Sequence, residues 1–250
     1  GMSRATRLHP RCRHAGSGTA GASMEARVAR DLTSARRGAA QGAARQIVVF
    51  LHGYGADGAD LLGLAEPLAP HLPDTAFFAP DAPEPCAAAP MGRQWFPIPW
   101  IDGSSEAAAM EGLARAATDL DAWLDGLLAA EGLGPDRLAL VGFSQGTMMS
   151  LHVVPRRPAP VACIAGFSGR LLQPERLGEA VSKPPVLLLH GDVDDVVPYP
   201  SMDEAAGHLV GAGFPVFTYT MQGTGHGIAP DGLGQAVLFL RRHLGLDAPG

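Results

Sequence analysis

From residue 46 onward, continuous apolar runs alternate with segments whose apolar residues recur at helical spacing. Residues 47–51, IVVFL, form a run rich in β-branched side chains, typical of a strand that is buried on both faces of a parallel sheet. Further strands are expected at 75–79, 137–143, 161–167, 186–190 and 216–221, and helices at 58–70, 105–131, 146–156, 201–212 and 231–244. This alternation predicts an α/β protein with a mostly parallel central sheet and helices on both faces.

The composition excludes several protein classes. The chain has 250 residues, of which 46% are hydrophobic and 18% charged, so it can bury the core of one large domain and is not disordered throughout. No stretch approaches the roughly 20 uninterrupted apolar residues that a membrane-spanning helix needs. The three cysteines, Cys12, Cys86 and Cys163, are scattered. They fit neither a disulfide framework nor a zinc site, which predicts a cytoplasmic protein.

The first 45 residues differ in charge from the rest. They carry nine arginines against two acidic residues, a balance of +7, so the remaining 205 residues sum to −13. An acidic main domain lacks the positive surface that nucleic acid or an anionic membrane requires. We expect residues 1–45 to form a disordered extension, with an organelle leader or a nucleic-acid arm as alternatives, and residues 46–250 to form one domain. Met24 is a candidate for the natural start, which the sequence does not decide, and Gly1 is interpreted as a remnant of expression.

The sequence Gly-Phe-Ser-Gln-Gly at 142–146 follows an expected strand and opens onto an expected helix. A serine on a sharp strand-to-helix turn needs small neighbours two residues away on either side, because the backbone and the helix approach closely there. The turn also places Ser144 at the N-terminus of a helix, whose dipole and free N–H groups favour a developing oxyanion. Ser144 is therefore the candidate nucleophile.

A nucleophilic serine requires a general base and a group that orients the base. In this type of fold the acid follows the serine in the chain, and the histidine follows the acid. His226 lies in a glycine-rich loop after the last expected strand and is the candidate base. The loop after strand 186–190 supplies three candidate acids, and their spacing alone does not separate them: Asp192, Asp194 and Asp195.

A glycine-rich segment, LHGYGADG at 51–58, follows the first strong strand. Glycines there free backbone N–H groups to face a substrate carbonyl, as one half of an oxyanion hole; a simple glycine turn into a helix is the alternative. We reject a dinucleotide-binding fingerprint, because Asp57 would stand where the phosphate approaches and no ribose-binding acid follows the next strand.

Six motifs together resemble the phospholipase/carboxylesterase family of serine α/β-hydrolases, which includes the acyl-protein thioesterases. They are LHGYGADG, GRQWFP at 92–97, GFSQG, GFSG at 166–169, HGDVDDVVP at 190–198 and GTGHG at 223–227. The resemblance covers about residues 46–244 and implies a compact α/β-hydrolase fold without a large cap domain. It implies hydrolysis of carboxylic esters, lysophospholipids or acyl thioesters through an acyl-enzyme, with no metal or other cofactor.

The same resemblance assigns roles to individual residues. The nucleophile falls on Ser144, the base on His226 and the acid on Asp194, which separates the three acidic candidates. The oxyanion donors would be the backbone N–H groups of Tyr54 and Gln145.

Three apolar residues are tentative walls of the substrate pocket. The resemblance supports Trp95 and Phe96 in this role, and Met148 follows the nucleophile on its helix. Core packing is the alternative for all three, although methionine also suits an adaptable pocket. On the same helix, Pro155 is expected to end or kink the helix early.

Other functions stay open at this point. An amidase or a peptidase would use the same machinery, and an α/β-hydrolase fold can also serve as a non-catalytic binding module. The expected partner is a small-molecule ester or thioester, and a homodimer that shields an apolar rim is compatible with the sequence. The sequence does not specify the acyl-chain length or the choice between ester and thioester.

Overall fold

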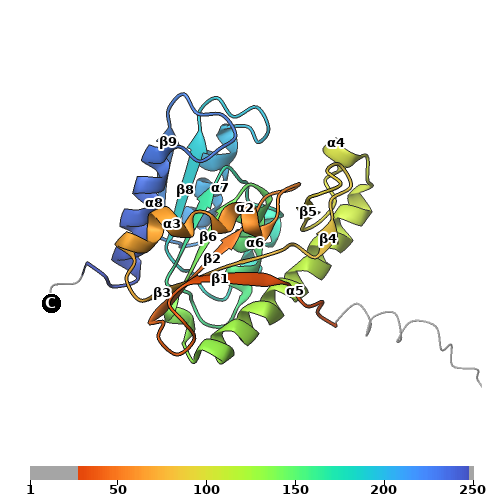
Figure 1. The fold of residues 1–250 in the computed structure, drawn as a ribbon. Coiled ribbons are helices and arrows are strands. Elements are labelled where there is room, and N and C mark those ends of the chain that lie inside the picture. The colour runs from red at the N-terminus through yellow and green to blue at the C-terminus, as the bar shows by residue number, and fades with distance from the viewer. Residues whose placement is uncertain (1–27, 248–250) are drawn as a thin grey trace, which may run out of the picture.

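The computed structural model describes residues 28–247, which fold around a seven-stranded sheet of order β1-β3-β2-β6-β7-β8-β9 (Figure 1). The strands of this sheet are β1 (Ser34–Gly38), β2 (Gln46–Leu51), β3 (Thr75–Pro80), β6 (Leu138–Phe143), β7 (Cys163–Phe167), β8 (Val186–Gly191) and β9 (Val216–Met221). All neighbouring strands pair in parallel except β1, which runs antiparallel to β3 at the edge. The mostly parallel sheet expected from the apolar runs is confirmed.

Helices cover both faces of this sheet. They are α2 (Gly58–Leu62), α3 (Ala65–Leu68), α4 (Pro99–Asp102), α5 (Glu106–Glu131), α6 (Gln145–Val153), α7 (Pro200–Gly211) and α8 (Pro230–His243). Alternate residues of β2 point to opposite faces, as in any strand. Ile47 and Val49 join the core beneath α5, α6 and α7, whereas Val48 and Phe50 join the core beneath α2, α3 and α8. Figure 1 shows α2, α3 and α8 together on one side of the sheet.

The expected helix at 58–70 is divided into three short pieces. α2 ends at Leu62 and is followed by Gly63 at its C-cap, α3 spans only four residues, and a 3₁₀ turn, η1 (Ala69–His71), completes the segment. Gly63 weakens helix propagation, and Pro67 cannot donate a backbone hydrogen bond. The later helix behaves as expected, because α6 ends at Val153 and tightens into the 3₁₀ turn η3 (Val154–Arg156) around Pro155.

The stretch 80–104, which lies between the expected strand at 75–79 and the expected helix at 105–131, contains regular structure. Two short strands, β4 (Glu84–Pro85) and β5 (Arg93–Gln94), pair antiparallel, and α4 follows them. Figure 1 shows this segment at one end of the sheet, beside α5. Strands of two residues carry no detectable alternation, so the pattern of the sequence could not reveal them.

The boundary expected at residue 45 is wrong, because the fold already includes β1. This strand, SARRG, has no apolar alternation, since it is a short edge strand that pairs on one side only. The Arg36 guanidinium binds the Glu131 carboxylate (Nη2 to Oε2, 3.0 Å) and lies over the Phe78 ring. Part of the basic N-terminal region is thus structural. The expectation for residues 1–27 lies outside the described residues.

Within residues 28–247, no helix is both long and apolar enough to cross a membrane. The carboxyl ends of the parallel strands meet at one edge of the sheet, which is where open α/β sheets place their ligand sites. The loops that follow β2, β6, β8 and β9 carry the motifs singled out in the sequence.

Candidate active site

Ser144 occupies a strained turn between β6 and α6. Its backbone has φ 54° and ψ −115°, in a region that L-residues other than glycine seldom adopt. The flanking glycines are required by space: a Cβ atom at Gly142 would lie 2.6 Å from the Thr147 nitrogen, and one at Gly146 would lie 1.8 Å from the Leu51 carbonyl oxygen. The turn therefore projects Ser144 from the end of the sheet through close backbone packing, as the motif predicts.

Three predicted side chains form one hydrogen-bonded chain. His226 Nε2 lies 3.1 Å from Ser144 Oγ, and His226 Nδ1 lies 2.8 Å from Asp194 Oδ2. They come from the loops after β6, β8 and β9, far apart in the sequence. In this arrangement the imidazole can accept the Ser144 proton while its other nitrogen donates to Asp194, as a serine–histidine–aspartate arrangement requires.

Asp194 is held by its surroundings as well as by His226. Its side chain is fully buried, and its Oδ1 atom accepts hydrogen bonds from the Val196 and Val197 N–H groups, each at 2.9 Å. Burial alone would raise the pKa of this carboxyl, but the hydrogen bonds from His226 and the two N–H groups outweigh it and lower the pKa. The group is thus a carboxylate that orients the imidazole.

The neighbouring acidic residues take other positions. Asp192 Oδ1 accepts a hydrogen bond from the Gly223 N–H group (2.8 Å), which ties the acidic loop to the loop of His226. Asp195 is exposed. Among Asp192, Asp194 and Asp195, only Asp194 therefore contacts the imidazole.

The loop after β2 lies directly against Ser144. A Cβ atom at Gly53 would lie 3.2 Å from the Ser144 Cβ atom. Within residues 28–247, the N–H groups of Tyr54 and Gln145 donate to no protein acceptor, so both are free for a substrate oxygen. The loop begins at His52, whose Nε2 accepts from the Ala82 N–H group (2.9 Å). Burial lowers the pKa of His52, which stays neutral and donates from Nδ1 to the Gly53 carbonyl.

Trp95 was expected to line the substrate pocket, but in the structure it does not face the substrate side. The indole is 0% exposed and its Nε1–H group donates to the His52 carbonyl (2.9 Å). Its backbone N–H group donates to Gln145 Oε1 (2.8 Å), and Gln145 Nε2 donates to the Phe96 carbonyl (2.9 Å). Because a buried indole N–H group needs a partner, Trp95 braces the loop after β2 against α6.

Phe96 and Met148 do line a cavity, of about 160 Å³. The Met148 N–H group donates to the Ser144 carbonyl (3.1 Å), so the cavity wall begins one helical turn from the nucleophile. Most of the lining is apolar, which suits a hydrocarbon chain. The remaining lining residues are Pro97, Ile98, Pro99, Trp100, Glu106, Ala109, Met110, Leu113, Leu172 and Gln173.

Two residues of the site were not singled out as site residues by the sequence analysis. The Phe143 ring packs against the His226 imidazole, with 4.9 Å between ring centroids. A Cβ atom at Gly191 would lie 2.1 Å from the Thr224 carbonyl oxygen, so only glycine lets the two loops approach. Phe143 lies in the GFSQG motif beside Ser144, and Gly191 lies in the HGDVDDVVP motif before Asp194.

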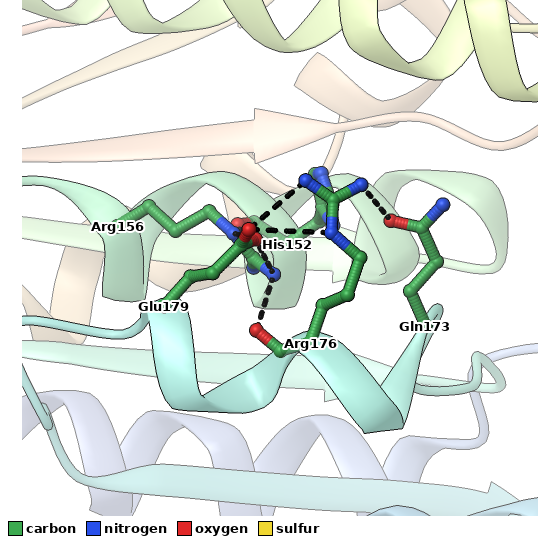
Figure 2. Close-up of polar contacts among 5 residues, drawn as sticks. All are labelled: His152, Arg156, Gln173, Arg176 and Glu179. Carbon is green, nitrogen blue, oxygen red and sulfur yellow. Dashed lines mark hydrogen bonds and ion pairs between the residues drawn. The ribbon is translucent and has the colours of Figure 1, made fainter.

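A second polar cluster lies at the other end of α6, away from Ser144. Figure 2 shows His152 with Arg156, Arg176, Glu179 and Gln173. Glu179 accepts hydrogen bonds from both guanidinium groups, at 3.0–3.2 Å. Since the arginine donors are satisfied within the protein, this cluster braces α6 against the 3₁₀ helix η4 (Pro174–Glu179). Within residues 28–247, no group of three or more His, Cys, Asp or Glu residues could hold a metal ion.

Comparison with known proteins decides the family. The family model described as Phospholipase/Carboxylesterase matches residues 37–244. The chain belongs to this family. Its members named below are esterases and thioesterases, so the chain is an enzyme of the ester-hydrolase class, and its fold is the α/β-hydrolase fold.

Relatives and solved structures agree with this membership. Acyl-protein thioesterase 1 of Gibberella zeae is 28% identical over 79% of this chain and 90% of its own length. Esterase YpfH of Escherichia coli is 27% identical over 74% of this chain and 77% of its own length. The crystal structure of esterase PE8 is 45% identical, with a TM-score of 0.81, and the match covers 86% of this chain and all of that one.

Proposed function

We propose that this family member is a serine hydrolase of carboxylic esters, with short- to medium-chain acyl esters, lysophospholipids or acyl thioesters as substrates. The observation that carries the proposal is the continuous hydrogen-bonded chain from Ser144 through His226 to the buried Asp194 carboxylate. The relatives named as thioesterases and esterases support the same two bond types. A small-molecule ester is the partner in this proposal, whereas a cytoplasmic location and a homodimer stay predictions from the sequence.

In the first half of the reaction, Ser144 Oγ attacks the substrate carbonyl and His226 Nε2 takes the hydroxyl proton. Negative charge develops on the carbonyl oxygen, where the N–H groups of Tyr54 and Gln145 donate to it. Each such donor contributes about 2.7–4 kcal/mol to the transition state in other hydrolases. Asp194 holds the imidazole in the tautomer that accepts at Nε2, and it stabilises the imidazolium that forms.

The first half ends when His226 gives its proton to the leaving alcohol or thiol, and the acyl group remains on Ser144. In the second half, water attacks the acyl carbonyl while His226 Nε2 takes a proton from it. His226 then gives this proton to Ser144 Oγ as the bond between Oγ and the acyl carbon breaks, which releases the acid and restores Ser144. The cavity lined by Phe96 and Met148 receives the acyl chain in this scheme.

The proposal is tested with p-nitrophenyl esters from acetate to palmitate, using the wild type and Ser144→Ala. The wild type is expected to release p-nitrophenol, and the variant to lose kcat/KM by at least about 10³-fold, since the attacking oxygen is removed. Ser150→Ala is a matched control, because this buried serine lies on the same helix and bonds only the Thr147 carbonyl. It is expected to remain active.

Thermal unfolding of all three proteins establishes that the samples are folded. A folded Ser144→Ala variant with wild-type turnover would show that another group is the nucleophile. A folded wild type that releases no p-nitrophenol and does not react with a fluorophosphonate probe would favour the non-catalytic binding module.

A further inference from the structure

The proposed oxyanion donor Tyr54 stands between two glycines. Gly53 has no side chain to anchor it, and Gly55 adopts φ +86°, a conformation that other residues rarely take. The loop is held after this point, because Gly55 N–H donates to the Arg93 carbonyl (2.8 Å). The Gly53–Tyr54 peptide that carries the N–H group is held at its carbonyl, which accepts from His52 Nδ1 (2.8 Å) and from the Ala56 N–H group (3.2 Å). The Tyr54 side chain provides a further attachment on the other side of this N–H group.

That side chain is held by Asp102, on a different segment of the fold. The Tyr54 hydroxyl donates to Asp102 Oδ2 at 3.0 Å. Burial, together with hydrogen bonds to Cys86 and Asp102, raises the pKa of the hydroxyl, so it keeps its proton and acts as the donor. The contact joins residues that lie 48 positions apart in the chain.

Asp102 also closes the short helix α4. Its Oδ2 atom accepts from the Ile98 N–H group and its Oδ1 atom from the Ser104 N–H group, both at 2.9 Å. Burial would raise the pKa of Asp102, but the hydrogen bonds from Ser104, Ile98 and Tyr54 outweigh it and lower the pKa. The carboxylate thus fixes both ends of α4 and the Tyr54 side chain at one point.

The same helix forms part of the apolar cavity. Ile98, Pro99 and Trp100 line it together with Met148 of α6. Trp100 is 61% exposed, and its ring is covered by the Arg170 guanidinium, at 5.3 Å from the ring centroid. A hydrocarbon chain in the cavity would bury apolar surface against these residues and so steady α4.

We propose that Asp102 is a positioning residue that couples the acyl-chain cavity to the oxyanion hole. An acyl chain packed against α4 fixes Asp102, and Asp102 fixes Tyr54 through the hydroxyl, so that the Tyr54 N–H group points at the developing oxyanion. Chain length then raises the acylation rate as well as the affinity, because binding energy from the remote chain is used in the transition state. This inference rests on the proposed ester hydrolysis.

The test is the acylation rate constant, measured from the burst of p-nitrophenol with the acetate and octanoate esters. In the wild type, octanoate is expected to acylate Ser144 about tenfold faster than acetate, a part of the 10²–10³-fold that one oxyanion donor contributes. In Asp102→Ala, which leaves the Tyr54 hydroxyl without its carboxylate acceptor, the octanoate rate is expected to fall to about the acetate rate. KM should still decrease with chain length, because the cavity wall is retained.

Tyr54→Phe removes the other partner of the same bond and should give the same loss. The double variant should lose no more than either single variant, since both remove one interaction. Ser105→Ala is the matched control: Ser105 caps α5 next to this segment by accepting from the Ala108 N–H group (3.0 Å), and it does not contact Tyr54. It is expected to lower stability but to leave the chain-length dependence of the acylation rate unchanged.

Equal chain-length dependence in the wild type and Asp102→Ala would overturn the coupling. Additive losses in the double variant, or a wild-type acylation rate that does not depend on chain length, would also overturn it. These outcomes differ from failure of the proposed function. In that case, the wild type would give no burst with any ester, and Ser144 would not react with a fluorophosphonate probe.

Discussion

The two ends of α6 are fixed by different forces. At its start, Gly146 touches the Leu51 carbonyl and Gly142 touches the Thr147 backbone, so the turn of Ser144 is fixed by contact between main chains. At its end, His152 and Arg156 meet Arg176 and Glu179, and charge governs the packing (Figure 2). One helix thus joins a site defined by steric contact to a brace defined by electrostatics.

The difference predicts how each end responds to change. Steric contact between backbones does not depend on pH or salt, and it fails only when atoms are added. A cluster of ionisable groups responds to protonation, to salt and to the loss of one charge. The proposed nucleophile, Ser144, lies at the sterically fixed end, where a shift of about 1 Å in its position would cost much of the rate.

The largest effect is expected from Gly146→Ala. The new methyl group would lie 1.8 Å from the Leu51 carbonyl oxygen, so β2 and α6 must separate, and we expect a loss of about 4 kcal/mol or more in the free energy of unfolding. Urea unfolding measures this loss. Gly126→Ala is the control, because a Cβ atom in that part of α5 has no atom within 4 Å; it should stabilise the helix by about 0.5–1 kcal/mol. A loss of less than about 1 kcal/mol in the free energy of unfolding of Gly146→Ala would show that the turn accommodates the methyl group at little cost.

An intermediate effect is expected from pH at the other end of α6. Burial, reinforced by Arg156 and Arg176, lowers the pKa of His152 to about 4, and its side chain is only 7% exposed. The unfolded chain, with a pKa near 6.5, binds more protons between these values, so the stability is complete above pH 6.5 and falls as the pH falls. From pH 7 to pH 5 we expect a loss of about 1–2 kcal/mol from this residue.

Urea unfolding at both pH values, in the wild type and His152→Asn, measures that contribution. The variant cannot titrate at this position, so its stability should fall less between pH 7 and pH 5. His208→Asn, on the exposed side of α7, should keep the wild-type dependence. If the wild type and His152→Asn lose the same stability between pH 7 and pH 5, the folded protein does not disfavour the protonated form of His152.

The smallest effect is expected from Glu179→Gln. This exposed carboxylate accepts from both Arg156 and Arg176, and exposed ion pairs contribute little to stability. Removing its negative charge leaves His152 facing two guanidinium groups, so the pKa of His152 should fall further. NMR titration of the His152 ring detects this shift, and added salt should reduce it. An upward shift would contradict the charge balance assigned to the cluster.

The sequence was most informative where local sterics and the reaction demand particular residues. The GxSxG motif predicted both the turn and Ser144, because only glycine fits beside the backbones at 142 and 146. The position of His226 after the last strand indicated it as the proposed base. Spacing alone did not separate the three aspartates, whereas the family resemblance assigned the acid to Asp194, and it is Asp194 that contacts His226 in the structure.

The sequence was least informative where long-range contacts decide the outcome. β1 was missed because its arginines look solvated, yet Arg36 pairs with Glu131 across about 90 residues of the chain. Arg30, which lies before β1, likewise pairs with the buried Asp119. Trp95 was expected beside the substrate, but the carbonyl of His52 and the side chain of Gln145 hold it in the core. Neither partner is near it in the chain.

By itself, the sequence determined the layered sheet and the serine turn, because strand burial and close backbone contact restrict which residues can stand at each position. Only the tertiary structure decided which aromatic residue lines the cavity and that Asp102 reaches Tyr54. Those choices depend on loops that converge from separate strands at one edge of the sheet. The distances between residues on these loops cannot be derived from their order in the sequence, because they are set by the packing of the folded chain.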